Sequence, residues 1–193
     1  MAPRKRTFDP TTTLDIAMEL FWERGYSHCS IADVVEASGV ARYGVYQAFG
    51  DKDALYRATL KRYHERVAAN LKIQLKTPNG GLAEIKNYFM GLSTKRERGD
   101  LRGCMACQAA VDRGQEDPQV AKIVDDIMED LRTTFGQAVE IGIARGEMRD
   151  VPKEDLVEFL VGLQRSLGTM ARTATPNQDI ERYIKVSLTL LDR

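Results

Sequence analysis

Residues that enzymes use for catalysis or metal binding are scarce in this chain, which has two histidines and three cysteines among 193 residues. The sequence also lacks a glycine-rich phosphate loop and a Gly-x-Ser-x-Gly nucleophile motif. Cys104 and Cys107 have the spacing of a redox motif, but the surrounding chain lacks the βαβ pattern of a thioredoxin-like protein. We therefore predict that the protein is not an enzyme and needs no metal and no cofactor.

Long apolar segments are missing as well. No apolar run is long enough to span a membrane, and the basic start MAPRKRTFDP is not followed by the apolar stretch of a secretory signal. The alternating pattern of a β-strand is also not found. With 43% hydrophobic and 29% charged residues, the chain has a globular composition. We expect an all-α, soluble, cytoplasmic protein with no membrane partner.

An excess of positive charge is absent too, because basic and acidic residues number 28 each and the pI is about 6.7. Nucleic-acid-binding proteins are often strongly basic, so the total charge argues mildly against DNA. The local distribution argues for DNA, since a basic arm precedes the first predicted helix: Arg4, Lys5 and Arg6. Acidic residues recur every four positions in that helix, on a face that we expect to point away from DNA: Asp15, Glu19 and Glu23.

The sequence is rich in segments where apolar residues recur every three to four positions, the period of an amphipathic helix. The predicted helices cover residues 10–24, 30–38, 41–49, 52–76, 82–96, 103–113, 118–145, 152–174 and a last stretch after Pro176. In the first helix we expect a buried stripe of Leu14, Ala17, Met18 and Phe21.

Two short helices separated by a glycine stand at the centre of the N-terminal part. Ser30 can cap the first helix, and its apolar face consists of Ile31, Val34 and Val35. Gly39 can adopt the positive φ that ends a helix and turns the chain. The pattern predicts a sharp turn into the second helix.

The second short helix has two faces. Its inward face is predicted to be apolar: Ala41, Val45, Ala48 and Phe49. Its outward face carries polar and aromatic groups: Arg42, Tyr43, Tyr46 and Gln47. Such groups hydrogen-bond to phosphates and base edges, and a helix fits the major groove of DNA. The pair is typical of a helix-turn-helix, although an ordinary αα-corner with a solvated face has the same pattern.

After the second short helix, Asp51 can cap the next one and Lys52 lies in its first turn, where the helix dipole disfavours a cation unless a phosphate is near. With these residues the chain resembles the TetR family of bacterial transcription regulators. The resemblance covers about the first quarter to third of the chain. It rests on Leu20-Phe21, Gly25-Tyr26, Ser30 to Val35, Ala37 to Val40, Tyr46, Phe49, Lys52 and Leu55.

The resemblance implies a helix-turn-helix DNA-binding domain over residues 1–51 and a helical ligand-binding and dimerisation domain over residues 52–193. It also implies a homodimer, paired through the two C-terminal helices, that binds a palindromic double-stranded DNA operator. Such a protein is typically a repressor, released here by an unknown small-molecule or redox effector. The alternative is a helical dimeric adaptor or structural protein that does not bind DNA.

On this basis we assign DNA contacts to Arg4, Lys5, Arg6, Ser30, Arg42, Tyr43, Gly44, Tyr46, Gln47 and Lys52. Alone, a basic arm is usually a solvated terminus, but ahead of a helix-turn-helix we interpret it as a DNA contact. The chain departs from the family pattern, which has a small and then a hydroxyl residue before the apolar-Tyr pair. Here Gly44 stands directly before Val45-Tyr46, so the backbone could approach DNA or the preceding helix closely. The operator sequence therefore cannot be taken from relatives.

The C-terminal helices are expected to pair with a second subunit, because the helix over 152–174 has a wider apolar surface than one neighbour would cover. Gly162 and Ser166, one turn apart, would allow close approach of helices. We place Leu163 and Leu188 in this interface, so that a charge there would give folded monomers. The alternative is that both helices only close the core of a single chain.

Candidates for an effector site are apolar or amide side chains of the regulatory helices: Tyr88, Phe89, Met105, Gln108, Met128 and Phe135. Each of them could equally be plain core. Cys104 is a redox candidate because it follows Arg102-Gly103 at a predicted helix start, where backbone N–H groups and a guanidinium favour a thiolate. Cys107, one turn further, would be its resolving thiol. The alternative is that both cysteines are small buried apolar residues.

Overall fold

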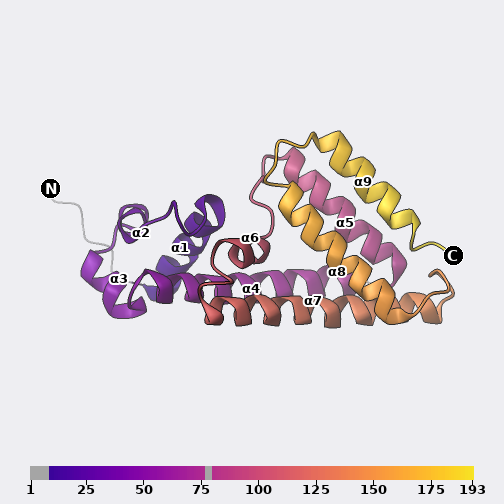
Figure 1. Ribbon diagram of the computed structural model, residues 1–193, viewed down its shortest axis with the longest axis horizontal. Helices are drawn as coiled ribbons and strands as arrows, with labels where there is room; N and C mark the ends of the chain where they lie inside the picture. Colours follow the sequence, from indigo (N-terminus) through magenta and orange to yellow (C-terminus); the bar gives the residue numbers. More distant parts are fainter. Residues whose placement is uncertain (1–8, 77–79) are drawn as a thin grey trace. The chain divides into compact units, whose positions relative to one another are not determined.

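The computed structural model describes residues 9–76 and 80–193, and its regular structure there consists of nine α-helices (Figure 1). They are α1 (Pro10–Arg24), α2 (Ile31–Ser38), α3 (Arg42–Phe49), α4 (Lys52–Lys76), α5 (Leu82–Glu97), α6 (Met105–Asp112), α7 (Pro118–Ala144), α8 (Lys153–Met170) and α9 (Asn177–Thr189). Within these residues, extended pairing is limited to one isolated bridge between Met148 and Asp192. The prediction of an all-α fold is confirmed. The basic arm of Arg4, Lys5 and Arg6 lies outside the described residues, as do residues 77–79, which follow the helix predicted over 52–76.

The start of α1 follows directly from its sequence. Asp9 precedes Pro10, and its carboxylate accepts the backbone N–H groups of Thr11 and Thr12 at 3.1 and 3.2 Å. The buried stripe differs from the expected one, because Thr13 is buried and Leu14 is only half-buried. The Thr13 hydroxyl can be buried since it donates to the Asp9 carbonyl at 2.9 Å.

The described chain forms two compact units that are not consecutive in sequence. The first comprises the described part of Met1–Arg66 together with Gln108–Asp125. The second comprises the described part of Val67–Cys107 together with Asp126–Arg193. The helices α4 and α7 each contribute to both units. The predicted boundary between a DNA-binding domain and a regulatory domain, after residue 51, divides the chain by function and not by packing. It stays a prediction.

Aromatic rings join α1 to α4 in the core of the first unit. The Tyr56 ring lies edge-on to Phe21 and Tyr26, with centroid distances of 5.1 and 5.0 Å. Trp22 and Tyr63 form a similar pair at 5.1 Å. The helix α2 packs on α1, and α3 packs on α2. This core therefore supports the two short helices of the predicted helix-turn-helix.

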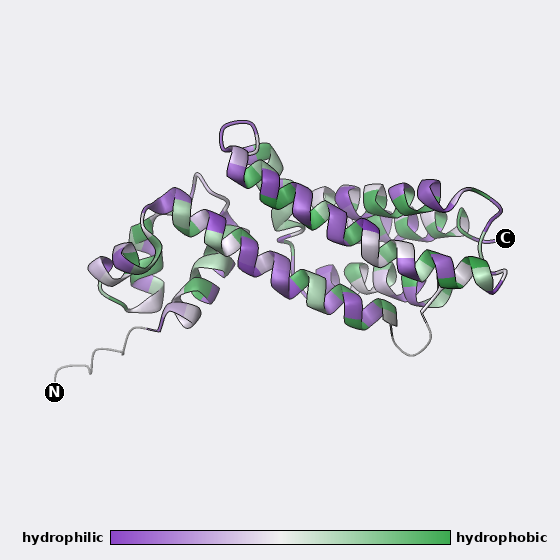
Figure 2. Ribbon diagram, turned by 90° about the horizontal axis from the view of Figure 1, so that it is seen from below, coloured by the Kyte–Doolittle hydropathy of each residue, from purple (hydrophilic) through white to green (hydrophobic). Residues whose placement is uncertain are grey.

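In the second unit, α9 packs against α5 and α8 and runs back along them (Figure 1). Their buried faces are apolar, and Figure 2 shows polar and apolar residues along every helix, as expected for amphipathic helices with one covered side. The apolar stripe of α7, a helix that contributes to both units, is buried from Val120 to Phe135. None of the helices in the described residues is long and apolar enough to cross a membrane.

Two helix ends differ from the prediction by two or more residues, and both differences have a physical cause. The helix α8 ends at Met170 rather than Ala174, because the Arg96 guanidinium binds the carbonyls of Ala171, Thr173 and Thr175 after the helix. The helix α6 begins at Met105 rather than Gly103. Gly103 has a φ of +66°, and a Cβ there would lie 2.1 Å from the Gly168 carbonyl oxygen. Only glycine fits this approach.

The predicted interface positions in the last two helices are wrong. Leu163 and Leu188 are 3% and 4% exposed within the single chain, because both belong to the core of the second unit. The exposed apolar residues of this region are Tyr183, Val186 and Leu190. Periodicity identified the helices as apolar, but it did not show which side the chain itself covers.

Candidate nucleic-acid interface

The turn between α2 and α3 is built by its cap residues. The Asp33 N–H donates to Ser30 Oγ at 3.2 Å, and the Ser30 N–H donates to Asp33 Oδ2 at 2.7 Å, which completes a capping box. Hydrogen bonds from Ser30 also lower the pKa of Asp33 below its ordinary value. Gly39 ends α2 in the left-handed region, with φ 70° and ψ 13°, and Val40 is buried behind it. Both ends of α2 are therefore capped, whereas Ala41 at the start of α3 makes no side-chain hydrogen bond.

The outward face of α3 is open to solvent. Arg42, Tyr43, Tyr46 and Gln47 are all exposed, and the Tyr43 side chain is 76% exposed. The Arg42 guanidinium donates to the Tyr46 hydroxyl at 3.4 Å and lies 5.7 Å from its ring centroid. The prediction that these side chains point outward is confirmed.

The inward face of α3 is narrower than expected. Val45 is fully buried and Phe49 is half-buried, but Ala41 and Ala48 are exposed. An eight-residue helix that rests mainly on one valine leaves most of its circumference free. The predicted burial of both alanines is therefore wrong, and the free surface is wider than the four predicted side chains.

Lys52 lies on an aromatic ring at the start of α4. Asp51 caps this helix by accepting the Ala54 N–H at 2.8 Å. The Lys52 ammonium nitrogen is 4.2 Å from the centroid of the Tyr26 ring, and the residue is half-buried. The aliphatic part of the Lys52 side chain can pack against the protein while its ammonium group reaches solvent. The ring thus compensates the unfavourable dipole position of this lysine.

The acidic stripe of α1 is largely neutralised by α4. Asp15 accepts Arg62 Nε at 2.7 Å, and Glu19 pairs with Arg66. These groups are partly exposed, so each pair contributes little to the free energy of folding. Their larger effect is to remove an uncompensated negative field from the first unit.

Family models match both parts of this chain. The model of the tetR family of bacterial regulatory proteins matches residues 9–59, and that of the tetracyclin repressor-like C-terminal domain matches residues 81–186. The chain belongs to the TetR family. It is a DNA-binding transcriptional regulator, which confirms the family and the function class expected from the sequence.

The similarity to known proteins covers nearly the whole length of this TetR-family chain. The uncharacterised regulator YezE of Bacillus subtilis is 26% identical over 192 residues, which cover 98% of this chain and 99% of YezE. The repressor ComR of Escherichia coli is 29% identical over 193 residues, covering 97% and 90%. A cysteine mutant of the TetR-family regulator CifR, solved with 26-bp double-strand operator DNA, is 25% identical with a TM-score of 0.82, covering 96% and 98%.

Three of the effector-site candidates of this TetR-family regulator form one aromatic cluster. The Phe89 and Phe135 rings are stacked at 5.6 Å, and Tyr88 lies edge-on to both at 5.1 and 5.9 Å. The Tyr88 hydroxyl donates to Gln164 Oε1 at 3.0 Å, and burial raises the Tyr88 pKa above its ordinary value. The cluster is fully packed in the second unit.

The other effector-site candidates are less concentrated. Met105 and Met128 are buried in the second unit, whereas Gln108 belongs to the first. Gln108 Oε1 is buried and has no hydrogen-bond partner in the described residues. The structure therefore brings together Tyr88, Phe89 and Phe135, but it does not place Gln108 with them.

The two candidate thiols contact each other. Cys104 is 6% exposed, and its N–H donates to the Gly168 carbonyl at 3.3 Å. The Cys107 thiol is half-buried and hydrogen-bonded with Cys104, and this bond, with burial, raises the pKa of Cys107. Cys107 Sγ also lies 3.9 Å from the Arg165 carbonyl oxygen. The preceding Arg102 guanidinium pairs with Asp100 at 2.9 Å.

Sequence reasoning missed a charged surface groove between α7 and α8, with a volume of about 430 Å³. Arg132 pairs with Glu158 at 2.5 Å and Lys153 with Glu140 at 2.8 Å along its walls. No sequence signal indicated this groove, because its residues are ordinary solvent-facing charges of two consecutive helices. Most of its lining is charged and five of these side chains form ion pairs, so it offers no strong site for an apolar effector.

Proposed function

We propose that this protein is a transcriptional repressor that binds a palindromic operator as a symmetric homodimer and releases it when an effector acts on the second unit. The exposed outward face of α3, following the capped α2, carries this proposal. It acts by binding, without a catalytic step. The operator-bound CifR structure and the repressor ComR support repression.

The roles of the DNA-binding residues follow from their chemistry. Arg42, Tyr43 and Gln47 project from α3 and are suited to base edges in the major groove. Tyr46 and Lys52 are suited to phosphate oxygens. Ser30 caps the N-terminus of α2, the end of a helix whose dipole favours an anion. Gly44 removes a side chain from the face that approaches DNA, and the arm of Arg4, Lys5 and Arg6 adds phosphate contacts.

The dimer uses the outer side of α8 and α9. Tyr183, Val186 and Leu190 are 39%, 59% and 48% exposed and recur at i, i+3 and i+7 on α9. On α8, a Cβ at Gly162 would meet no atom within 4 Å. The Ser166 and Tyr183 hydroxyls lie 3.1 Å apart and join the two helices on this side. An apolar stripe beside an open glycine suits an isologous helix pairing.

The effector acts either among the aromatic residues or at the thiols. A small apolar molecule would separate the Tyr88, Phe89 and Phe135 rings and use the Tyr88–Gln164 hydrogen bond for orientation. The hydrogen-bonded pair of Cys104 and Cys107 favours a second possibility, in which an oxidant modifies the protein. Residues 1–51 would read DNA, and residues 52–193 would receive the signal and dimerise.

A mobility-shift titration with the region beside its own gene tests the proposal. The expected result is a salt-dependent complex of two chains with one duplex, and a footprint with two half-sites centred about 34–36 Å apart or moderately more. A mixed-sequence duplex of the same length serves as the control for specificity. Equal affinity for both duplexes would contradict an operator in that region, and absence of any DNA binding would contradict the proposal itself.

A further inference from the structure

Two cations lie over the ring of Tyr26. One is the Lys52 ammonium, at 4.2 Å from the ring centroid, and the other is the Arg113 guanidinium, at 4.4 Å. Tyr26 follows α1, Lys52 opens α4, and Arg113 follows the last residue of α6. All three belong to the first unit. Arg113, which lies in the connection between α6 and α7, therefore packs on the same aromatic ring as Lys52, the lysine that we expect to contact DNA.

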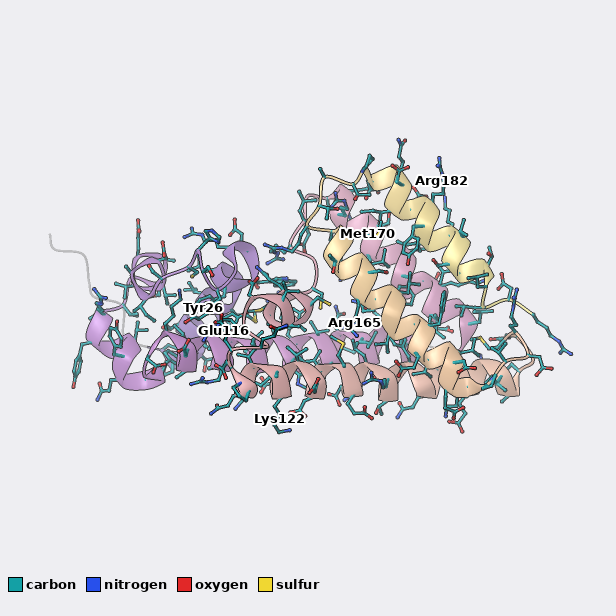
Figure 3. The ribbon with its side chains drawn as sticks, viewed as in Figure 1. Tyr26, Glu116, Lys122, Arg165, Met170 and Arg182 are labelled. Atoms are coloured by element: carbon teal, nitrogen blue, oxygen red, sulfur yellow. The ribbon has the colours of Figure 1, made fainter. Side chains whose placement is uncertain are left out.

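Asp53 completes this cluster, which we call the Tyr26 cluster: Tyr26, Lys52, Asp53 and Arg113. The Asp53 carboxylate accepts the Tyr26 hydroxyl and lies 3.3 Å from Arg113 Nη2. Burial and the hydrogen bond to Asp53 raise the Tyr26 pKa to about 12, so its hydroxyl stays a donor at neutral pH. The Arg113 side chain is 19% exposed and also pairs with Glu116 at 2.6 Å (Figure 3 labels Tyr26 and Glu116).

A second tie connects the same segment to α4. The Arg57 guanidinium donates to Asp117 Oδ2 at 2.7 Å. Asp117 also caps α7, since its Oδ1 accepts the N–H groups of Gln119 and Val120 at 2.9 and 3.3 Å. The connection between α6 and α7 is thus held to the first turns of α4 at two points.

We propose that Arg113 and Tyr26 are positioning residues for DNA binding, which hold the Lys52 ammonium on the DNA-facing side and neutralise the Asp53 carboxylate beside it. This inference rests on the proposed function. The pair does not touch DNA; it acts through Lys52 and Asp53.

The charges around Lys52 explain why such support is needed. Asp51 and Asp53 flank Lys52 in sequence, so two carboxylates lie close to any phosphate that Lys52 binds. Asp51 is engaged as the helix cap, and Asp53 is engaged by Tyr26 and Arg113. Without Arg113, Asp53 would compete with the phosphate for the Lys52 ammonium and repel the DNA backbone.

The same arrangement gives a route for regulation. A shift of the segment between α6 and α7 would withdraw Arg113 from Tyr26 and Asp53 and weaken the Lys52 contact while α3 keeps its structure. This route needs no change in the base-reading face, because the affected contact is to the backbone. Loss of affinity should then be equal for operator and mixed-sequence DNA.

The test compares Arg113→Gln with Arg132→Gln in the full-length protein. Arg132 is a matched control, since it also pairs with a glutamate three residues away, Glu129, and with a more distant carboxylate, Glu158. Both variants, with Arg113→Lys and Lys52→Ala, are titrated against the gene-adjacent fragment and a mixed-sequence duplex over a range of salt. Thermal unfolding by circular dichroism shows whether each variant is folded.

Arg113→Gln should weaken binding to both duplexes about tenfold and reduce the salt slope, while Arg132→Gln changes neither. Arg113→Lys keeps the positive charge but loses the planar stack, so it should restore part of the affinity. In the Lys52→Ala background, Arg113→Gln should cost about threefold or less, because the contact that it positions is gone.

The outcomes separate this inference from the proposed function. If Lys52→Ala weakens binding but folded Arg113→Gln binds with wild-type affinity and salt slope, the positioning role is wrong and the proposed function stands. A tenfold loss that is unchanged in the Lys52→Ala background would also contradict the inference, because the effect would not pass through Lys52. If the wild-type protein bound no DNA, both proposals would be wrong.

Discussion

The Arg57 guanidinium binds the Asp117 carboxylate at 2.7 Å, although the two residues are 60 positions apart in the chain. Burial alone would raise the pKa of Asp117, but the hydrogen bonds from Arg57 and from the first turn of α7 outweigh it, and the pKa is lowered. The pair therefore connects the start of α7 to α4 through a charge-assisted hydrogen bond, which favours the ionised form of Asp117.

Asp117→Asn should lower the free energy of unfolding by about 1–2 kcal/mol at neutral pH, because the amide can still cap α7 but loses the charged partner. The folded-state pKa of Asp117 lies below the unfolded-state value of about 4, so its stabilisation is present above that pH and is lost as the pH falls through the folded-state pKa. Urea unfolding at a series of pH values measures this. The difference between wild type and variant should shrink in acid, whereas the exposed control Asp125→Asn should differ little at any pH. A difference that does not change with pH would contradict the ionised pair.

Substitutions on the DNA-facing surface should divide into two classes. Lys52→Ala should weaken binding to every duplex and reduce the salt slope by about one, because it removes a phosphate contact. Arg42→Ala and Gln47→Ala should each cost about 1–3 kcal/mol and relax the choice of base at particular operator positions. Tyr46→Phe should lose only a phosphate hydrogen bond. Quantitative mobility shifts with single-base operator variants distinguish the classes, and wild-type affinity for both Lys52→Ala and Arg42→Ala at all salt concentrations would refute the assignment.

Two neighbouring positions in α9 should respond oppositely to a charge. Val186 is 59% exposed and Leu188 is 4% exposed. Val186→Glu should give a folded monomer with weak operator binding, because a charge would be buried between subunits. Leu188→Glu should destabilise each chain by several kcal/mol, since the charge would enter the core of the second unit. Light scattering and thermal unfolding at equal concentration measure both effects. A wild-type protein that is monomeric at micromolar concentration would exclude the dimer.

Local signals were sufficient for much of the fold and for the DNA-facing helix. Ser30 and Gly39 encode helix ends through contacts within four residues, so the sequence alone predicted them. The outward face of α3 followed from helical periodicity for the same reason.

Long-range packing accounts for what the sequence did not reveal. The end of α8 depends on Arg96, which is 75 positions before Ala171. The Tyr26 cluster depends on Arg113, which is 60 positions after Asp53. Helical periodicity identifies an apolar face, but it does not show whether the same chain or a second subunit packs against it. For this reason Leu188 was placed in the dimer interface and Val186 was not.

The last prediction concerns the thiols of Cys104 and Cys107. The hydrogen bond with Cys104, together with burial, raises the pKa of Cys107 and keeps its thiol protonated at neutral pH. We expect hydrogen peroxide to oxidise Cys104 first: its thiolate takes one oxygen and becomes a sulfenic acid, and the peroxide leaves as hydroxide. Attack by the Cys107 thiol would then release water and form a disulfide. Because a regular helical turn does not fit a disulfide, the start of α6 would have to loosen.

Oxidation of Cys104 should therefore release the operator, and a thiol reductant should restore binding. The eight residues of α6 separate Cys104 from Arg113, so a disturbed start of this helix can change the support of Lys52. Cys104→Ser should keep DNA binding and lose the response to peroxide. Cys107→Ser should still respond, but without an intramolecular disulfide in mass spectra. Cys29→Ser is the matched control, since burial raises its pKa to about 11 and its thiol should react slowly. Unchanged operator affinity after complete oxidation of Cys104 would exclude a redox switch and leave the aromatic cluster of Tyr88, Phe89 and Phe135 as the effector site to test.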